Sequence, residues 1–204
     1  MARPPRFTRA DVIDSACAIA DEQGLAAVTM SAVASRLGAT PMALYHHVAS
    51  KEHLLDLLIG AVLSEVPDVD DLPPGWAQLE ALARGLREVA DRHPAVFPLL
   101  LQRPAVAAGS LALRARIRDA LRSSGVPPDA LDRGERLVST VALGFLASET
   151  SGRFANVPRE QRNADFERLL GMVRRGLPAL YGDSTAAAVR DDGDPGSGEF
   201  AQNA

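Results

Sequence analysis

Apolar residues recur every three or four positions along most of this chain, which is the spacing that places them on one face of an α-helix. Glycine and proline residues interrupt the pattern, and these residues end helices or begin new ones. Together the two signals predict helices over residues 8–23, 31–37, 41–47, 51–66, 76–92, 95–101, 110–124, 131–151 and 164–181. The pattern therefore predicts an all-α fold.

The stretch over residues 28–55 is the most informative part of the chain. Its first helix, Ser31–Leu37, ends at Gly38, where a residue without a Cβ adopts a left-handed conformation at least cost. Thr40 is a suitable N-cap for the next helix, and Pro41 suits the first helical position because no N–H is needed there. Two helices joined by a short turn that contains glycine have the form of a helix-turn-helix, a DNA-reading motif.

The second helix of this pair carries small and polar residues on its outer side. Thr40 and His46 offer hydrogen-bonding groups to base edges, and Ala43 offers a methyl group to a thymine methyl. Tyr45 has a phenol long enough to reach a phosphate oxygen, and Lys51 adds a full charge at the N-terminus of the following helix. The predicted DNA contacts are Arg6, Thr29, Ser31, Thr40, Pro41, Met42, Ala43, Tyr45, His46 and Lys51.

Two other interpretations of these residues stay open at this point. A glycine-broken apolar pattern also fits an ordinary helical hairpin, in which Tyr45 packs with its hydroxyl at the surface. His46, His47 and His53 are close in sequence, but no cysteine or carboxylate completes a metal-ligand spacing with them. We therefore predict no metal site among these histidines.

The run from Thr8 to Val66 also resembles the N-terminal domain of the tetracycline-repressor-like (TetR-type) regulators. The similarity rests on a capped first helix, on VTMSAVASRLG, on ALYHHV in the reading helix and on SKEHLL, and it covers about a third of the chain. It implies a homodimer of all-helical subunits that binds a palindromic operator and whose C-terminal domain binds an effector. By position, the residues predicted above from Thr40 to His46 fall on the family's reading helix, and Lys51 on its phosphate contact.

The clearest boundary is the segment PDVDDLPPG at residues 67–75, which combines prolines and acids without a helical period. We predict a DNA-binding helix-turn-helix domain with an N-terminal arm over 1–66, an effector-binding and dimerisation domain over 67–182, and a disordered tail over 183–204. The segment 131–151 is apolar nearly all round, so we expect burial on every side. We predict that the last two helices pair with their copies in a second subunit as a four-helix bundle.

The net charge does not support DNA binding by itself. It is −4 for the chain, and residues 1–66 carry five Arg or Lys against seven Asp or Glu. Arg3, Arg6 and Arg9 nevertheless lie in a stretch without acids, which the prolines between them hold extended. Such an arm either enters an adjacent minor groove or is a disordered tail, and the sequence leaves both open.

Residue constellations for catalysis are missing from the chain. Neither GxxxxGK nor GxGxxG occurs, and the C-terminal part has one histidine and no cysteine, so we predict no enzyme and no cofactor. The single cysteine, Cys17, excludes a disulfide framework within one chain. No apolar run is long enough to cross a bilayer and no signal peptide is recognised, so we expect a cytoplasmic protein.

A helical core of this kind often holds an apolar pocket with a few polar groups between its helices. The candidate ligand contacts are Trp76, His93, Phe97, Phe145, Glu149 and Met172. Plain core or interface is the simpler explanation for each of them, since large apolar side chains mostly have that role. Glu149 is the exception, because a buried acid needs a partner. That partner is either a ligand amine or an arginine of the same chain.

We interpret the chain as a homodimeric, ligand-responsive transcriptional regulator, most simply a repressor. Its expected partners are double-stranded operator DNA, a second copy of the chain and a small-molecule effector, and no membrane. The alternative is a helical protein-interaction module that retains the fold without operator reading. The negative net charge and the short, weakly polar reading helix favour that alternative.

Overall fold

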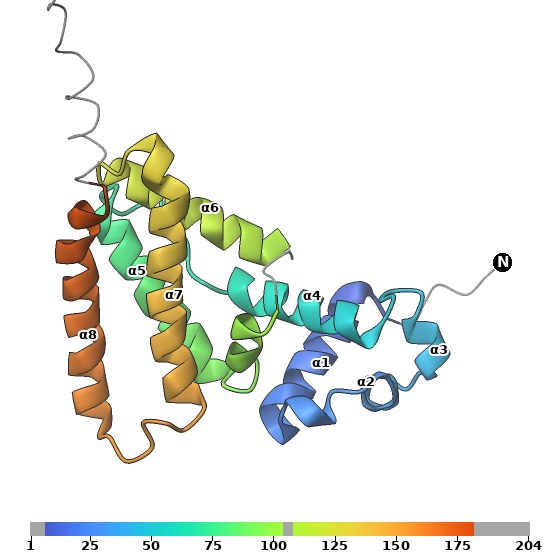
Figure 1. The fold of residues 1–204 in the computed structure, drawn as a ribbon. Helices are drawn as coiled ribbons and strands as arrows, with labels where there is room; N and C mark the ends of the chain where they lie inside the picture. The colour runs from blue at the N-terminus through green and yellow to red at the C-terminus, as the bar shows by residue number, and fades with distance from the viewer. Residues whose placement is uncertain (1–6, 104–107, 182–204) are drawn as a thin grey trace, which may run out of the picture.

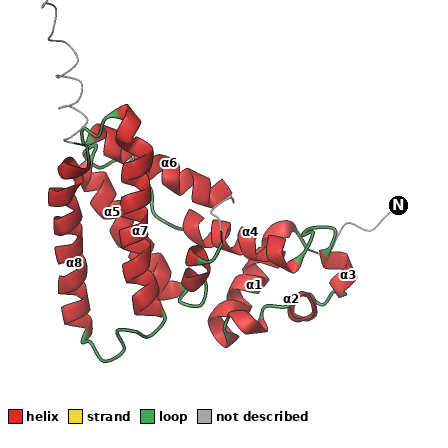
Figure 2. Cartoon of the chain, viewed as in Figure 1, coloured by secondary structure: helices red, strands yellow, loops and turns green. Residues whose placement is uncertain are grey.

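A computed structural model describes residues 7–103 and 108–181 of the chain. Over these residues the chain forms helices and turns and no strand, so the prediction of an all-α fold is confirmed (Figure 2). The α-helices are α1 Arg9–Gln23, α2 Met30–Arg36, α3 Pro41–Leu44, α4 Lys51–Ser64, α5 Trp76–Arg92, α6 Ala108–Ser123, α7 Leu131–Thr150 and α8 Arg159–Gly176. Short 3-10 helices lie at η1 Leu25–Ala27, η2 Phe97–Leu101, η3 Pro128–Ala130 and η4 Leu177–Leu180.

Three predicted helices differ from the observed ones. The α-helical part of the reading helix ends at Leu44 and passes into a turn, and the segment predicted over 95–101 forms only the 3-10 helix η2. Helix α8 begins at Arg159 rather than at residue 164, because Pro158 supplies an extended N-cap and the polar first turn carries no apolar signal. It ends before Pro178, which has no N–H for a continuing helix.

The helices form two groups joined by α4 (Figure 1). Helices α1, α2 and α3 gather around the N-terminal part of α4, and α3 lies at the end of the molecule that is farthest from α8. Helices α5 to α8 form the other group, in which α7 and α8 run side by side along one edge. No helix in the part of the chain that the structure describes is long and apolar enough to span a membrane.

Helix α1 begins with the predicted capping box. The Thr8 hydroxyl accepts from the backbone N–H of Asp11 at 3.2 Å, and the backbone N–H of Thr8 donates to the Asp11 carboxylate at 2.6 Å, which lowers the pKa of Asp11. The buried side of α1 is centred on Val12, Ala16, Ile19 and Ala20. Cys17 is half-buried, and burial raises the pKa of its thiol to about 12, so it stays protonated.

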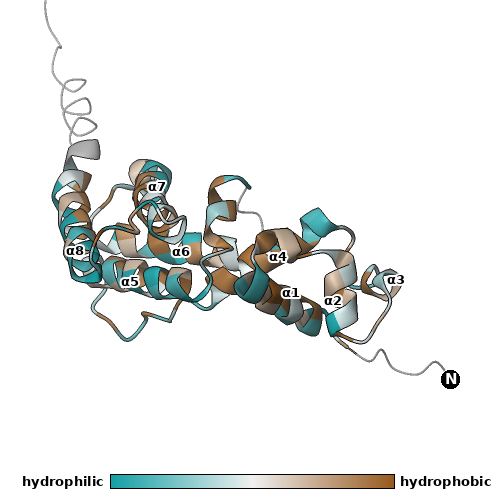
Figure 3. Ribbon diagram, turned by 90° about the horizontal axis from the view of Figure 1, so that it is seen from below, coloured by the Kyte–Doolittle hydropathy of each residue, from teal (hydrophilic) through white to brown (hydrophobic). Residues whose placement is uncertain are grey.

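One hydrophobic core runs through both groups of helices. Helix α4 contributes Leu54, Leu55, Leu58, Ile59, Val62 and Leu63 to it. The same core extends from Val12 in α1 to Leu146 in α7 and Phe166 in α8. A second, smaller core around Leu121 and Leu131 closes the far end of α5 to α8. Figure 3 shows hydrophobic residues concentrated where α1 and α4 meet, and a mostly hydrophilic outer surface on α8.

Helix α7 is not buried on every side within one chain, contrary to the prediction. Leu137 is 40% exposed and Val141 is 37% exposed, and the two residues lie one helical turn apart on the same face. The apolar residues of this face find no cover among the described residues of the same chain, and a second subunit would supply it. The predicted four-helix bundle therefore has an exposed apolar face available, and dimerisation itself stays a prediction.

We expect the double substitution Leu137→Glu and Val141→Glu to convert a dimer into a monomer, because two buried, unpaired carboxylates would oppose association. Light scattering after size-exclusion chromatography at micromolar concentration measures the mass. The control is Ala26→Glu with Gln102→Glu, which adds the same charge at other exposed positions and should remain dimeric. A monomeric unmodified protein, or a dimeric double variant, would contradict the prediction.

Candidate DNA interface and ligand cavity

The helix-turn-helix forms as its residues predict. The Thr29 hydroxyl caps α2 by accepting from the N–H of Ala32 at 3.1 Å. Gly38 follows α2 with φ of 63°, the left-handed conformation that only glycine adopts cheaply. Leu44 and Val48 are fully buried beneath α3 and the turn after it, so the opposite side of α3 faces solvent.

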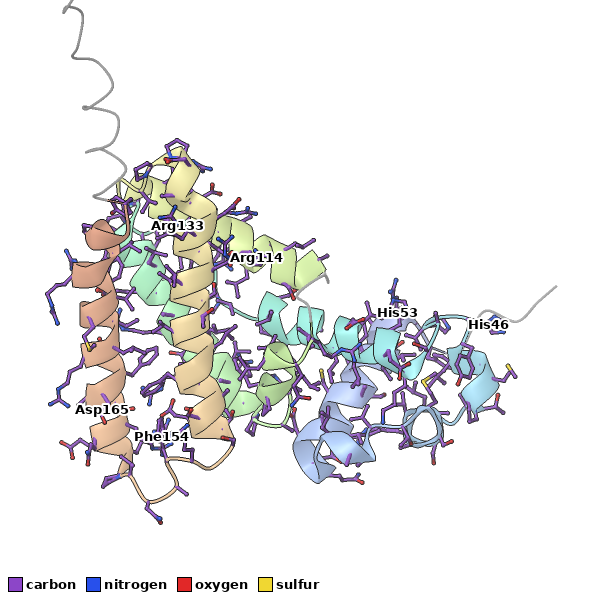
Figure 4. All side chains as sticks on the ribbon, viewed as in Figure 1. His46, His53, Arg114, Arg133, Phe154 and Asp165 are labelled. Carbon is purple, nitrogen blue, oxygen red and sulfur yellow. The ribbon has the colours of Figure 1, made fainter. Side chains whose placement is uncertain are left out.

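Most of the predicted DNA contacts that the structure describes are exposed. Met42 is 71% exposed, and Tyr45 is about half exposed. Exposed positions are also taken by Thr29, Ser31, Thr40, Pro41 and His46, whereas Ala43 and Lys51 are half-buried. His46 lies with α3 at the tip of the molecule (Figure 4), and Arg6 is outside the described residues.

Thr40 occupies the N-cap position of α3, but its side chain makes no capping hydrogen bond. Thr40 is thus the N-cap residue, as predicted, but its hydroxyl does not accept a hydrogen bond from the first turn of the helix. Its exposed hydroxyl remains available to an external partner. The next helix is capped as predicted, because the Ser50 hydroxyl accepts from the N–H of His53 at 3.1 Å, and Lys51 is the first residue of that helix.

The three neighbouring histidines have separate surroundings. His46 is exposed, while the ring of His47 packs on Phe7 with 5.0 Å between the ring centroids. Nδ1 of His53 accepts from the backbone N–H of Ala49 at 3.0 Å and so ties the turn to α4. His47 and His53 therefore each have a local structural role.

A cavity of about 290 Å³ lies between α5, α6, α7 and α8, in the other group of helices. Its walls are mostly apolar and include Leu82, Leu86, Leu113, Ile117, Phe166 and Leu170. Such a cavity, with few polar groups among apolar walls, is typical of a small-molecule site between the helices of a bundle.

The most buried charged group in the cavity wall is Glu135, whose residue is 2% exposed. The guanidinium of Arg114 donates to both of its carboxylate oxygens, at 3.1 and 2.8 Å, and the Ser139 hydroxyl donates at 3.1 Å. The hydrogen bonds to Glu135 raise the pKa of Arg114, so the guanidinium keeps its positive charge. Figure 4 shows Arg114 between α6 and α7.

Of the six predicted ligand contacts, Trp76 lines this cavity. The structure places His93 between Asp21 and Glu65 at the junction of the two groups, and buries Phe97 in the main core. The remaining three, Phe145, Glu149 and Met172, also lie outside the cavity wall, and Met172 is exposed.

Glu149 is paired with an arginine of its own chain, the second of the two alternatives for this acid. Nε and Nη2 of Arg87 donate to its two oxygens at 2.8 and 2.7 Å, and its side chain is 4% exposed. Nη1 of Arg162 lies 3.6 Å from Oε1 of Glu149. The Arg87 guanidinium lies over the Phe166 ring, with its central carbon 4.8 Å from the ring centroid. The hydrogen bonds to Glu149 raise the pKa of Arg87.

Comparisons with known proteins agree with this arrangement of helices. Residues 12–58 match the family described as bacterial regulatory proteins, tetR family, and residues 79–173 match the tetracyclin repressor-like C-terminal domain. An HTH-type transcriptional regulator from Saccharopolyspora erythraea is 30% identical over 88% of this chain and 78% of its own length. The chain belongs to the TetR family. The transcriptional repressor DrrR1 from Streptomyces coeruleorubidus is 29% identical over 80% of this chain, and the match spans 62% of DrrR1.

Solved structures of the family superpose on most of the chain. Apo ActR from Streptomyces coelicolor aligns with a TM-score of 0.76 at 25% identity, over 90% of this chain and all of ActR. ActR in complex with (S)-DNPA aligns with a TM-score of 0.66, over 92% of this chain and all of that one. BioQ with its double-stranded DNA operator aligns with a TM-score of 0.66 at 28% identity, over 82% of this chain and 98% of BioQ.

Sequence reasoning missed the polar residues that line the cavity of this TetR-family chain. Arg114, Arg118 and Arg122 stand four residues apart on α6, a spacing typical of a solvated helix face, although Arg114 pairs with buried Glu135. Among the acids of α7, Glu149 was the predicted ligand contact, whereas Glu135 lines the cavity. The spacing of Glu135 and Ser139, one helical turn apart, was a usable signal for a polar cluster on one face.

We expect Glu149→Gln to lower the free energy of unfolding by about 3 kcal/mol, because it leaves the Arg87 charge buried without a counter-charge. Urea unfolding followed by circular dichroism measures the change. Glu167→Gln is the matched control, since the Arg84–Glu167 pair is exposed and should contribute less than about 1 kcal/mol. Equal stabilities of the Glu149 variant and the unmodified protein would contradict the structural role.

Proposed function

We propose that this protein is a ligand-responsive transcriptional repressor that binds a palindromic operator as a homodimer in the cytoplasm. The proposal rests mainly on one observation, that an exposed reading helix and an apolar cavity share one hydrophobic core through α4. Two solved relatives support the two functions separately, because BioQ was solved with its DNA operator and ActR with (S)-DNPA.

In this proposal α3 enters the major groove and reads base edges from its N-terminal residues. Thr40 and His46 donate or accept hydrogen bonds, and Ala43 and Met42 offer apolar contact to thymine methyl groups. Tyr45 and Lys51 contact phosphates and position the helix. In a homodimer, two such helices reach half-sites about 34–36 Å apart, one turn of DNA.

The charged side chains near the reading helix make a limited contribution to DNA affinity. Arg36 is held by Glu22 through two hydrogen bonds of 2.8 Å, which raise the pKa of Arg36 and lower that of Glu22. Binding therefore depends on Lys51 and polar contacts more than on a broad cationic surface.

Helix α6 provides the route from the cavity to α4. It lines the cavity through Ser110, and the preceding residue, Gly109, lies directly on the backbone of α4. A Cβ added at Gly109 would stand 2.0 Å from the Gly60 carbonyl oxygen and 2.4 Å from the Ser64 hydroxyl. A ligand that moves α6 must therefore also move α4, which carries the reading module, and it can change DNA affinity only by its own preference between the two states.

The alternative, a helical interaction module without operator reading, is not favoured by the comparisons. The matched families and relatives are regulators, and the operator-bound BioQ structure superposes on most of this chain. Half of the negative net charge that supported the alternative lies outside residues 1–66, away from the reading helix.

Selection of operator sequences from random duplex DNA tests the proposal. We expect an enriched palindrome with the unmodified protein, and loss of enrichment with Tyr45→Ala or Lys51→Ala, because each removes a positioning phosphate contact. Lys51→Ala should also reduce the slope of log affinity against log salt by roughly 2 per dimer, at about 0.9 per lost contact. Gln102→Ala, an exposed change in the other group of helices, is the control. No enrichment at low salt would support the interaction module instead.

Gly109→Ala tests the route through α6. We expect the free energy of unfolding to fall by about 1–3 kcal/mol and operator binding to weaken, because the added methyl group separates α6 from α4. Gly176→Ala is the control, since no atom lies within 4 Å of a Cβ there. Urea unfolding and fluorescence anisotropy with the selected operator measure the two effects. Unchanged operator affinity would rule out this contact as the route.

A further inference from the structure

The cavity between α5, α6, α7 and α8 is open along one of its walls. Among the described residues that line it, those of α4, η2, α5, α6 and α8 are all buried or half-buried. The exposed lining residues are Arg136, Thr140 and Val141, and all three belong to α7. The opening therefore lies along α7. A molecule held by one subunit alone would keep part of its surface in water there, whereas ligand sites bury most of the surface of their ligand.

The opening adjoins the exposed apolar face of α7 and α8. Val141 belongs both to the cavity wall and to this face, and Leu137 lies one helical turn before it. Helices α7 and α8 run side by side in opposite directions (Figure 1), and the ring centroids of Phe145 and Phe166 are 5.4 Å apart. Six residues along each helix from this contact, Met172 is level with Leu137 and Val141, and it is 62% exposed.

A second copy of the chain is the partner that fits this face. The chain belongs to the TetR family, whose members act as dimers. The polar surface beside Met172 carries both signs of charge, as in the ion pair of Asp165 and Arg168, so a copy related by a two-fold axis does not meet only like charges. A copy that covers Leu137 and Val141 also covers the opening, because Val141 belongs to both.

We propose that the second subunit completes the effector cavity: its α7–α8 face closes the opening along α7, and a bound molecule contacts both subunits. The proposal rests on the proposed function in taking the cavity as the effector site and the protein as a homodimer. It adds that ligand binding and dimerisation are linked equilibria. A molecule held between two subunits also acts directly on their relative orientation, and so on the spacing of the two reading helices.

Thiol labelling tests the closure of the cavity without any ligand. Thr140→Cys in a Cys17→Ala background places one thiol at the opening, and Ala26→Cys in the same background is the exposed control. Leu137→Glu with Met172→Glu supplies the monomer, because the added carboxylates oppose association, and neither residue lines the cavity. We expect the thiol at position 140 to react with a maleimide in the monomer and to lose most of that reactivity in the dimer. The thiol at position 26 should react equally in both.

N-phenyl-1-naphthylamine, an uncharged apolar dye, tests the shared site. Trp76 is the only tryptophan of the sequence and lines the cavity, so energy transfer from Trp76 reports dye that is bound there. We expect the monomer to bind the dye about tenfold more weakly than the dimer, the effect of returning about 55 Å² of apolar surface to water. Saturating dye should in turn tighten the dimer about a hundredfold, tenfold for each of its two sites.

Dilution of the unmodified protein supplies a monomer without any substitution, and its dye affinity should fall in the same way. Four results would each overturn the proposal: equal labelling of position 140 in monomer and dimer, a double variant that stays dimeric, equal dye affinity of monomer and dimer, and absence of energy transfer from Trp76.

Operator selection with the same preparations separates this proposal from the proposed function. Sequence-selective DNA binding together with any of the four contrary results would refute the shared site alone. Absence of selective DNA binding would refute the repressor, and the labelling and dye measurements would still decide whether the second subunit closes the cavity.

Discussion

Burial of α4 on two sides is the constraint on which the rest of the structure depends. Leu54, Leu58, Val62 and Leu63 of α4 are all buried in one core, which also contains residues of α1, α5 and α6. Each such side chain stabilises the folded state by about 1.5–3 kcal/mol through burial alone. Neither group of helices keeps its core without α4, so we expect the two to fold as one cooperative unit.

Polar contacts at the ends of α4 reinforce this arrangement. His93 lies between Asp21 of α1 and Glu65, with ring nitrogens 2.8 and 3.1 Å from their carboxylate oxygens. Arg103 donates to Asp56 at 2.9 Å and to the Glu52 carbonyl at 3.0 Å. These contacts orient α4 relative to the C-terminal helices, and the core provides most of the energy.

The reading helix was predictable because its signals are local. Gly38, Pro41 and Ser50 act on the backbone within a few residues of themselves, and buried Leu44 decides which side of α3 faces out. The cavity was not predictable in the same way. Arg114 and Glu135 are 21 residues apart and meet only when α6 packs against α7, so the spacing of arginines along α6 did not indicate which of them would pair with a buried acid.

The sequence by itself determined the all-α fold, the helix-turn-helix, the caps of α1 and α4, and the boundary-like segment after α4, because each depends on residues close in the chain. Only the tertiary structure decided that Glu149 pairs with Arg87, and that Trp76 lines the cavity and His93 does not. Those outcomes depend on which faces of separate helices meet, and hydrophobic spacing along one helix carries no information about its neighbour.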